Sequence, residues 1–72
     1  MSEWKERKMA QLITRADTIV GACEGLKVAI AHEADPGYRM YLANTVMPFL
    51  EAEKRKANSE AEEYRREHFE VA

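Results

Sequence analysis

The sequence has a single cysteine, Cys23, and no cluster of cysteine and histidine residues. One cysteine excludes an intramolecular disulfide, and without a Cys/His cluster there is no ligand set for structural zinc. A chain of 72 residues buries too little surface for a secure core, so domains of this size usually need a disulfide, a metal or oligomerisation. Oligomerisation is therefore the stabilising device that we expect.

A long apolar run is also missing. No stretch approaches the roughly 18 apolar residues of a membrane span, and residues 1–6 lack the apolar segment of a signal peptide. We therefore predict a cytoplasmic protein with no membrane partner.

Neither sign of charge is in large excess, since eleven Lys and Arg residues against thirteen Asp and Glu residues leave a net charge of −2. A duplex-DNA binder normally concentrates basic residues on one face, and a DNA mimic needs a larger acidic excess. Basic clusters at 5–8, 54–56 and 65–66 are diluted by neighbouring glutamates. Binding of nucleic acid by the basic ends is therefore only an alternative function.

Motifs for catalysis are absent. Cys23 falls in an apolar helical pattern, and His32 and His68 are far apart without ligand spacing. No glycine-rich phosphate loop follows a strand, and the carboxylates at 60–63 have the pattern of a solvated helix face. The sequence predicts no catalytic, cofactor-binding or metal site, and we expect that the protein is not an enzyme.

The first half of the chain is free of proline and follows a heptad pattern. Apolar residues recur at alternating steps of three and four, and two more lie beside them, which predicts one helix over about 3–33 with a wide apolar stripe. The predicted core and dimer seam consists of Met9, Leu12, Ala16, Ile19, Cys23, Leu26 and Ile30, with Ile13 and Val20 beside it.

Gly21 and Gly25 are unfavourable inside this helix, at up to about 1 kcal/mol each relative to alanine. They lie on the side away from the seam. Either they allow a second helix to approach closely, or they are tolerated as exposed glycines, or they mark a kink that divides the helix near position 21. The sequence leaves these interpretations open.

Asp35-Pro36-Gly37 is the strongest break in the chain. Aspartate suits the N-cap of a following helix and proline its first turn, so we predict a short turn over 34–37 and a second helix over about 38–57. A short link makes long helices antiparallel neighbours. The face expected against the first helix contains Tyr38, Leu42, Thr45, Val46, Phe49 and Ala52, of which Leu42, Val46 and Phe49 are assigned to the core.

Pro48 removes a backbone hydrogen bond, so the helix either kinks near 48 or ends there and a new helix starts. The apolar pattern continues through Phe49 without a change of phase, which favours the kink. The charged segment over about 59–70 is either a third helix or a continuation of the second. In both cases a thin stripe formed by Ala57, Ala61, Tyr64 and His68 is expected near the Trp4 end of the first helix.

Two methionines, Met40 and Met47, flank Asn44 on a face expected to be exposed. Methionine adapts to varied surfaces, so this face is either part of a self-interface or a site for another protein. Tyrosine and arginine are common interface anchors. The predicted partner-binding residues are therefore Arg39, Met40, Tyr41, Asn44 and Met47.

Together these features predict an all-α antiparallel hairpin that dimerises into a helical bundle. The leading function is a non-enzymatic module that binds and modulates another protein. Its small size is typical of adaptors and of inhibitors from phages and other mobile elements. A second alternative is an oligomer that sequesters a nucleotide or another small ligand between subunits, with a pocket lined by His32, Tyr38, Arg39 and Tyr41.

Overall fold

The computed structural model describes residues 3–69 and confirms the all-α prediction for them. The described chain contains α1 (Glu3–His32), α2 (Pro36–Tyr41), a π-helical segment η1 (Leu42–Val46) and α3 (Met47–His68), and no strand. The last residue of the segment predicted over 59–70 lies outside the described residues.

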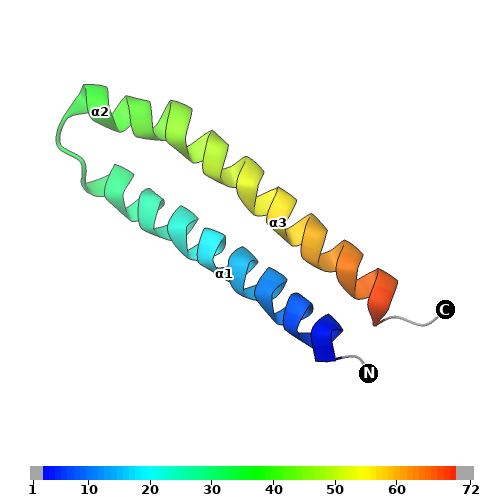
Figure 1. Ribbon diagram of the computed structural model, residues 1–72. Coiled ribbons are helices and arrows are strands. Elements are labelled where there is room, and N and C mark those ends of the chain that lie inside the picture. The colour runs from blue at the N-terminus through cyan, green and yellow to red at the C-terminus, as the bar shows by residue number, and fades with distance from the viewer. Residues whose placement is uncertain (1–2, 70–72) are drawn as a thin grey trace.

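The helices form two arms that lie side by side and run in opposite directions (Figure 1). One arm is α1, and we call the other, formed by α2, η1 and α3, the second arm. The extents of the molecule are 54 × 18 × 13 Å, and its radius of gyration is 16.2 Å. A compact chain of this length would have a radius of about 11 Å, so the molecule is a thin rod rather than a globule.

Asp35 starts the second arm as an N-cap. Its Oδ1 accepts hydrogen bonds from the backbone N–H groups of Gly37 at 2.9 Å and Tyr38 at 3.2 Å. These bonds satisfy donors that have no partner within the helix, and Pro36 occupies a position where a missing N–H costs nothing. The helix therefore begins at Pro36 rather than near residue 38.

Pro48 is accompanied by a change in helix type. Just before it, the N–H of Met47 donates to the carbonyl of Leu42, five residues back, within the π-helical segment. Proline has no N–H and its ring crowds the carbonyl four residues earlier, which favours a wider turn at this point. A wider turn rotates the following helix relative to the preceding one. The expectation that the apolar phase continues unchanged past Pro48 is therefore wrong.

The rotation decides which residues of the second arm face α1. Leu42 and Ala57 are buried, and Leu50 and Tyr64 are half-buried. By contrast, Phe49 is 63% exposed, and Tyr38, Thr45 and Ala52 are exposed as well. An unbroken α-helical phase would place Phe49 in the core, and the π-helical segment moves it out of the contact between the arms.

The seam of α1 faces the second arm as its periodicity predicts. Ala16 and Cys23 are buried, and Met9, Leu12, Ile19, Leu26 and Ile30 are half-buried. The two flanking residues are different, because Ile13 is 47% and Val20 39% exposed. The contact between the arms thus covers the central seam of α1 and leaves its flank open.

α3 continues through Asn58 and Ser59 without a break, so residues up to His68 belong to one helix. Its end packs near the start of α1, where the rings of His68 and Trp4 meet edge to face at 5.9 Å and the Tyr64 ring lies 4.3 Å from His68. Arg15 and Glu60 form an ion pair at 3.4 Å between the arms. No helix in the described chain has the length and apolar character needed to cross a membrane.

Candidate interaction surfaces

The chain exposes much more surface than its mass requires. A compact protein of 8.3 kDa has about 4,600 Å² of accessible surface, roughly 800 Å² less than the 5363 Å² of this chain. Only Ala16, Cys23, Leu42 and Ala57 are buried among the described residues, and Leu42 alone of these has a large side chain. Two arms alone therefore make a thin contact and leave apolar surface uncovered.

One uncovered region lies where the second arm begins. Tyr38, Met40 and Tyr41 are 52%, 63% and 52% exposed, and the two tyrosine rings stack at 6.2 Å with an interplanar angle of 18°. Arg39 and Asn44 are also exposed. We call these five residues the turn-end patch.

The predicted partner surface is only partly brought together. Arg39, Met40, Tyr41 and Asn44 lie on the outside, as expected, but Met47 is half-buried. Met47 follows the π-helical segment, and the rotation there separates it from the stripe that contains Met40. Phe49 is 63% exposed, although the sequence predicts it in the core. Its exposure could be predicted only from the helix phase after the π-helical segment.

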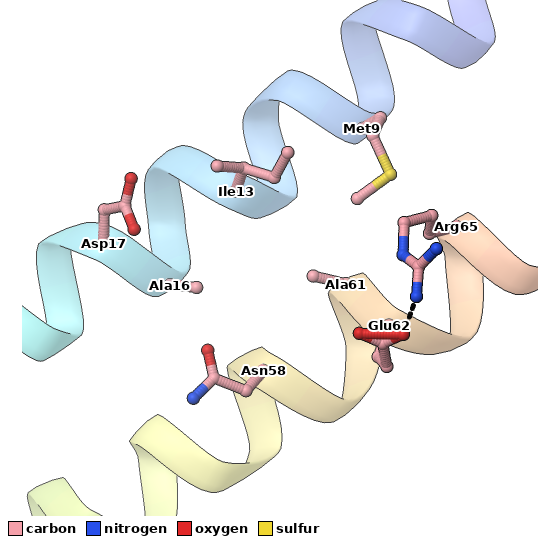
Figure 2. Close-up of a pocket in the computed structure, with 8 residues that line it drawn as sticks. All are labelled: Met9, Ile13, Ala16, Asp17, Asn58, Ala61, Glu62 and Arg65. Atoms are coloured by element: carbon pink, nitrogen blue, oxygen red, sulfur yellow. Dashed lines mark hydrogen bonds and ion pairs between the residues drawn. The ribbon is translucent and has the colours of Figure 1, made fainter. Parts of the chain in front are cut away.

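A groove of about 360 Å³ runs along one side of the contact between the arms. In Figure 2, Met9 and Ile13 on α1 face Ala61 and Arg65 on α3 across this groove. Its complete lining is Met9, Ile13, Ala16, Asp17, Asn58, Ala61, Glu62 and Arg65, and Arg65 donates to the Glu62 carboxylate. We call this the groove side. The α3 residues of this lining are not among the site residues that the sequence predicts.

The opposite side of the arm contact has a different character. A smaller groove of about 180 Å³ is lined by Lys8, Leu12, Glu60, Glu63, Tyr64 and Glu67. Three of these residues are glutamates, so we call it the acidic side. The Tyr64 hydroxyl lies buried there without a hydrogen-bond partner among the described residues.

Gly21 and Gly25 do not support a close approach of helices within the chain. A Cβ atom added at either position would meet nothing within 4 Å, and neither glycine has a positive φ angle. The helix is unbroken at both positions, so no kink divides it near residue 21. Within one chain they are exposed glycines in a regular helix.

The residues considered for chemistry are far apart. Cys23 is 1% exposed in the seam, His32 is exposed at the end of α1 by the turn, and His68 packs at the other end of the rod. Residues 3–69 contain no group of three or more His, Cys, Asp or Glu side chains that could hold a metal ion. Neither groove is lined by His32 or by the tyrosines of the turn-end patch.

No protein-family model, curated protein or solved structure matches this chain. Its function is therefore inferred from the exposed surfaces of the chain itself.

Proposed function

We propose that this chain is a non-enzymatic protein–protein interaction module of the cytoplasm. In this proposal its helical hairpin pairs with a second copy to form a bundle, and the homodimer binds and modulates another protein as an adaptor or inhibitor. The observation that carries the proposal is the excess of about 800 Å² in exposed surface over that of a compact chain of this mass.

The size of this excess fits a specific interface. Each partner in a standard protein–protein interface contributes about 800 Å². Ile13 and Val20 extend the apolar stripe of α1 beyond its contact with the second arm, and such a width is typical of a bundle helix with two neighbours. Pairing of two copies would supply the second neighbour of α1.

The turn-end patch is the surface that we assign to the foreign partner. It combines two stacked tyrosines with Arg39 and Met40. Tyrosine and arginine dominate binding energies at many interfaces, and methionine adapts to the shape of the partner. The patch lies at the end of the rod, so it remains accessible when the long sides of the arms are covered.

The self-association is tested by native mass spectrometry and light scattering of the purified chain at micromolar concentration. The proposal expects a homodimer whose population falls on dilution. A monomer across the micromolar range would contradict it.

Binding to a foreign protein is tested by quantitative pull-down from a cell lysate with the wild type, Met40→Glu and Val28→Glu. Met40 and Val28 have similar exposures of 63% and 59%, but only Met40 belongs to the turn-end patch, which makes Val28→Glu the matched control. We expect one captured protein to be lost with Met40→Glu and retained with Val28→Glu. Equal capture by both variants would reject the turn-end patch as the binding surface.

A further inference from the structure

The groove side of α1 carries a column of four residues spaced seven apart: Glu6, Ile13, Val20 and Lys27. Residues seven apart lie on the same side of a helix. Ile13 lines the groove, and all four residues are exposed. The column thus has two apolar residues in its middle and opposite charges at its ends.

This order is self-complementary for an antiparallel second copy. A two-fold axis between residues 16 and 17 places Glu6 opposite Lys27 of the second copy, and Ile13 opposite its Val20. The symmetry repeats both pairings, so apolar residues meet in the centre and ion pairs form on either side. Lys27 also lies 3.5 Å from Glu24 of its own helix, a weak exposed pair that leaves its other N–H donors available.

The groove side of α3 repeats the pattern. Glu51, Asn58 and Arg65 are also seven residues apart, and the last two line the groove. A two-fold axis at Asn58 places Glu51 opposite Arg65 of the second copy. Ala16, Asp17 and Asn58 line the same groove, so the symmetry centres of α1 and α3 lie at the same level of the rod. A single two-fold axis therefore pairs opposite charges along both α1 and α3.

The acidic side does not have this property. Its α3 column consists of Glu53, Glu60 and Glu67, so an antiparallel copy docked there would place Glu53 opposite the second copy's Glu60 or Glu67. Like charges in direct opposition are unfavourable at an interface. The charge pattern thus distinguishes the two sides of the rod.

We infer that the groove side is the self-interface, and that the second copy docks on it by two-fold antiparallel symmetry. This inference rests on the homodimer of the proposed function and deepens it. In the resulting four-helix bundle, α1 packs against α1 of the second copy and α3 packs against its α3. The turn-end patches lie at opposite ends of the bundle.

One residue opposes the arrangement. Asp17 lies next to the axis, so the two copies bring two carboxylates near each other, and neither carboxylate forms an ion pair with another described residue of its own chain. Asp17→Asn removes this repulsion and should tighten the dimer several-fold. If the second copy docked on the acidic side, this change would leave the dissociation constant unaltered.

The decisive experiment mixes two charge-reversal variants. In a homodimer of Glu6→Lys, both pairs place the introduced lysine against Lys27, and in a homodimer of Lys27→Glu, both place the introduced glutamate against Glu6. Each homodimer should bind roughly tenfold more weakly than the wild type. The heterodimer of the two variants restores opposite charges in both pairs. One pair joins the wild-type Glu6 of one chain to the wild-type Lys27 of the other. The second pair joins the introduced lysine to the introduced glutamate. Native mass spectrometry with one chain isotope-labelled should therefore show heterodimer above the statistical proportion.

The control uses the ion pair within one chain. Arg15→Glu mixed with Glu60→Arg should give the statistical proportion, because Arg15 and Glu60 pair within a chain. Circular dichroism checks that each exposed substitution preserves the helix. A wild-type dimer with statistical mixing of the Glu6 and Lys27 variants would overturn the assigned interface while leaving self-association intact. A monomeric wild type would overturn the inference and the homodimer together.

Discussion

The two arms of this molecule are similar in length, but the apolar pattern of the sequence predicts the buried face of one arm better than that of the other. α1 is a regular helix of 30 residues without proline, and its heptad pattern identifies the residues that contact the second arm. The second arm contains Pro48, and its inner face shifts at the π-helical segment. Apolar spacing therefore identifies a buried face only when the helix type is constant along it.

The largest expected effect separates the two candidate inner faces of the second arm. Ala57 is 1% exposed, whereas Phe49 is 63% exposed. Ala57→Asp buries a carboxylate against the α1 seam and should lower the free energy of unfolding by about 3 kcal/mol. Phe49→Asp changes a solvated position and should alter it by less than about 0.5 kcal/mol. Urea unfolding followed by circular dichroism, at one protein concentration, measures both.

The reverse order of these two effects would indicate that the second arm keeps one unbroken α-helical phase. If Phe49→Asp unfolded the chain while Ala57→Asp was tolerated, the second arm would have to face α1 as its sequence first indicates. Ala57→Ser controls for size at the buried position, because it adds a small polar group without a full charge.

Much of the architecture follows from short-range chemistry that the sequence displays. Asp35 and Pro36 define the start of the second arm because a side-chain acceptor and a preset φ angle act locally. The face of α3 does not follow in this way, since it depends on how the chain accommodates the missing N–H of Pro48. A usable signal is present in the seven-residue spacing of Leu50, Ala57 and Tyr64, but the charged residues between them obscure it.

The candidate surfaces were predictable to a similar extent. The turn-end patch requires only that residues beside a turn be exposed, and its tyrosines and Met40 are exposed. Predicting the groove side requires knowledge of how the two arms are aligned along the rod. That alignment brings Asp17 and Asn58 to the same groove, although they are far apart in the sequence. Sequence periodicity alone gives no such alignment.

An effect of intermediate size is expected when the two glycines inside α1 are replaced. A Cβ added at Gly21 or Gly25 meets no atom within 4 Å, and glycine inside a helix costs about 1 kcal/mol relative to alanine. The Gly21→Ala, Gly25→Ala double variant should therefore raise the free energy of unfolding by about 1 to 2 kcal/mol. Thermal unfolding measures the gain. The dissociation constant of the proposed dimer is expected to stay unchanged, because both glycines lie away from the groove side.

A loss of stability or of dimer in this double variant would mean that another helix packs on the glycines. The outer face of α1 would then be the self-interface in place of the groove side. Thr14→Ala is a suitable comparison, because Thr14 is exposed on the same face of α1 and its substitution leaves both glycines in place.

The smallest expected effect concerns the ion pair between the arms. Arg15 and Glu60 lie 3.4 Å apart, but their side chains remain 45% and 40% exposed. Water screens such a pair, and ordering two long side chains costs entropy, so its coupling energy should be below about 0.5 kcal/mol. A double-mutant cycle with Arg15→Ala and Glu60→Ala measures this coupling directly. A value above about 1 kcal/mol would mean that the pair is desolvated in the assembled protein. In that case the acidic side, and not the groove side, would be the self-interface of the proposed dimer.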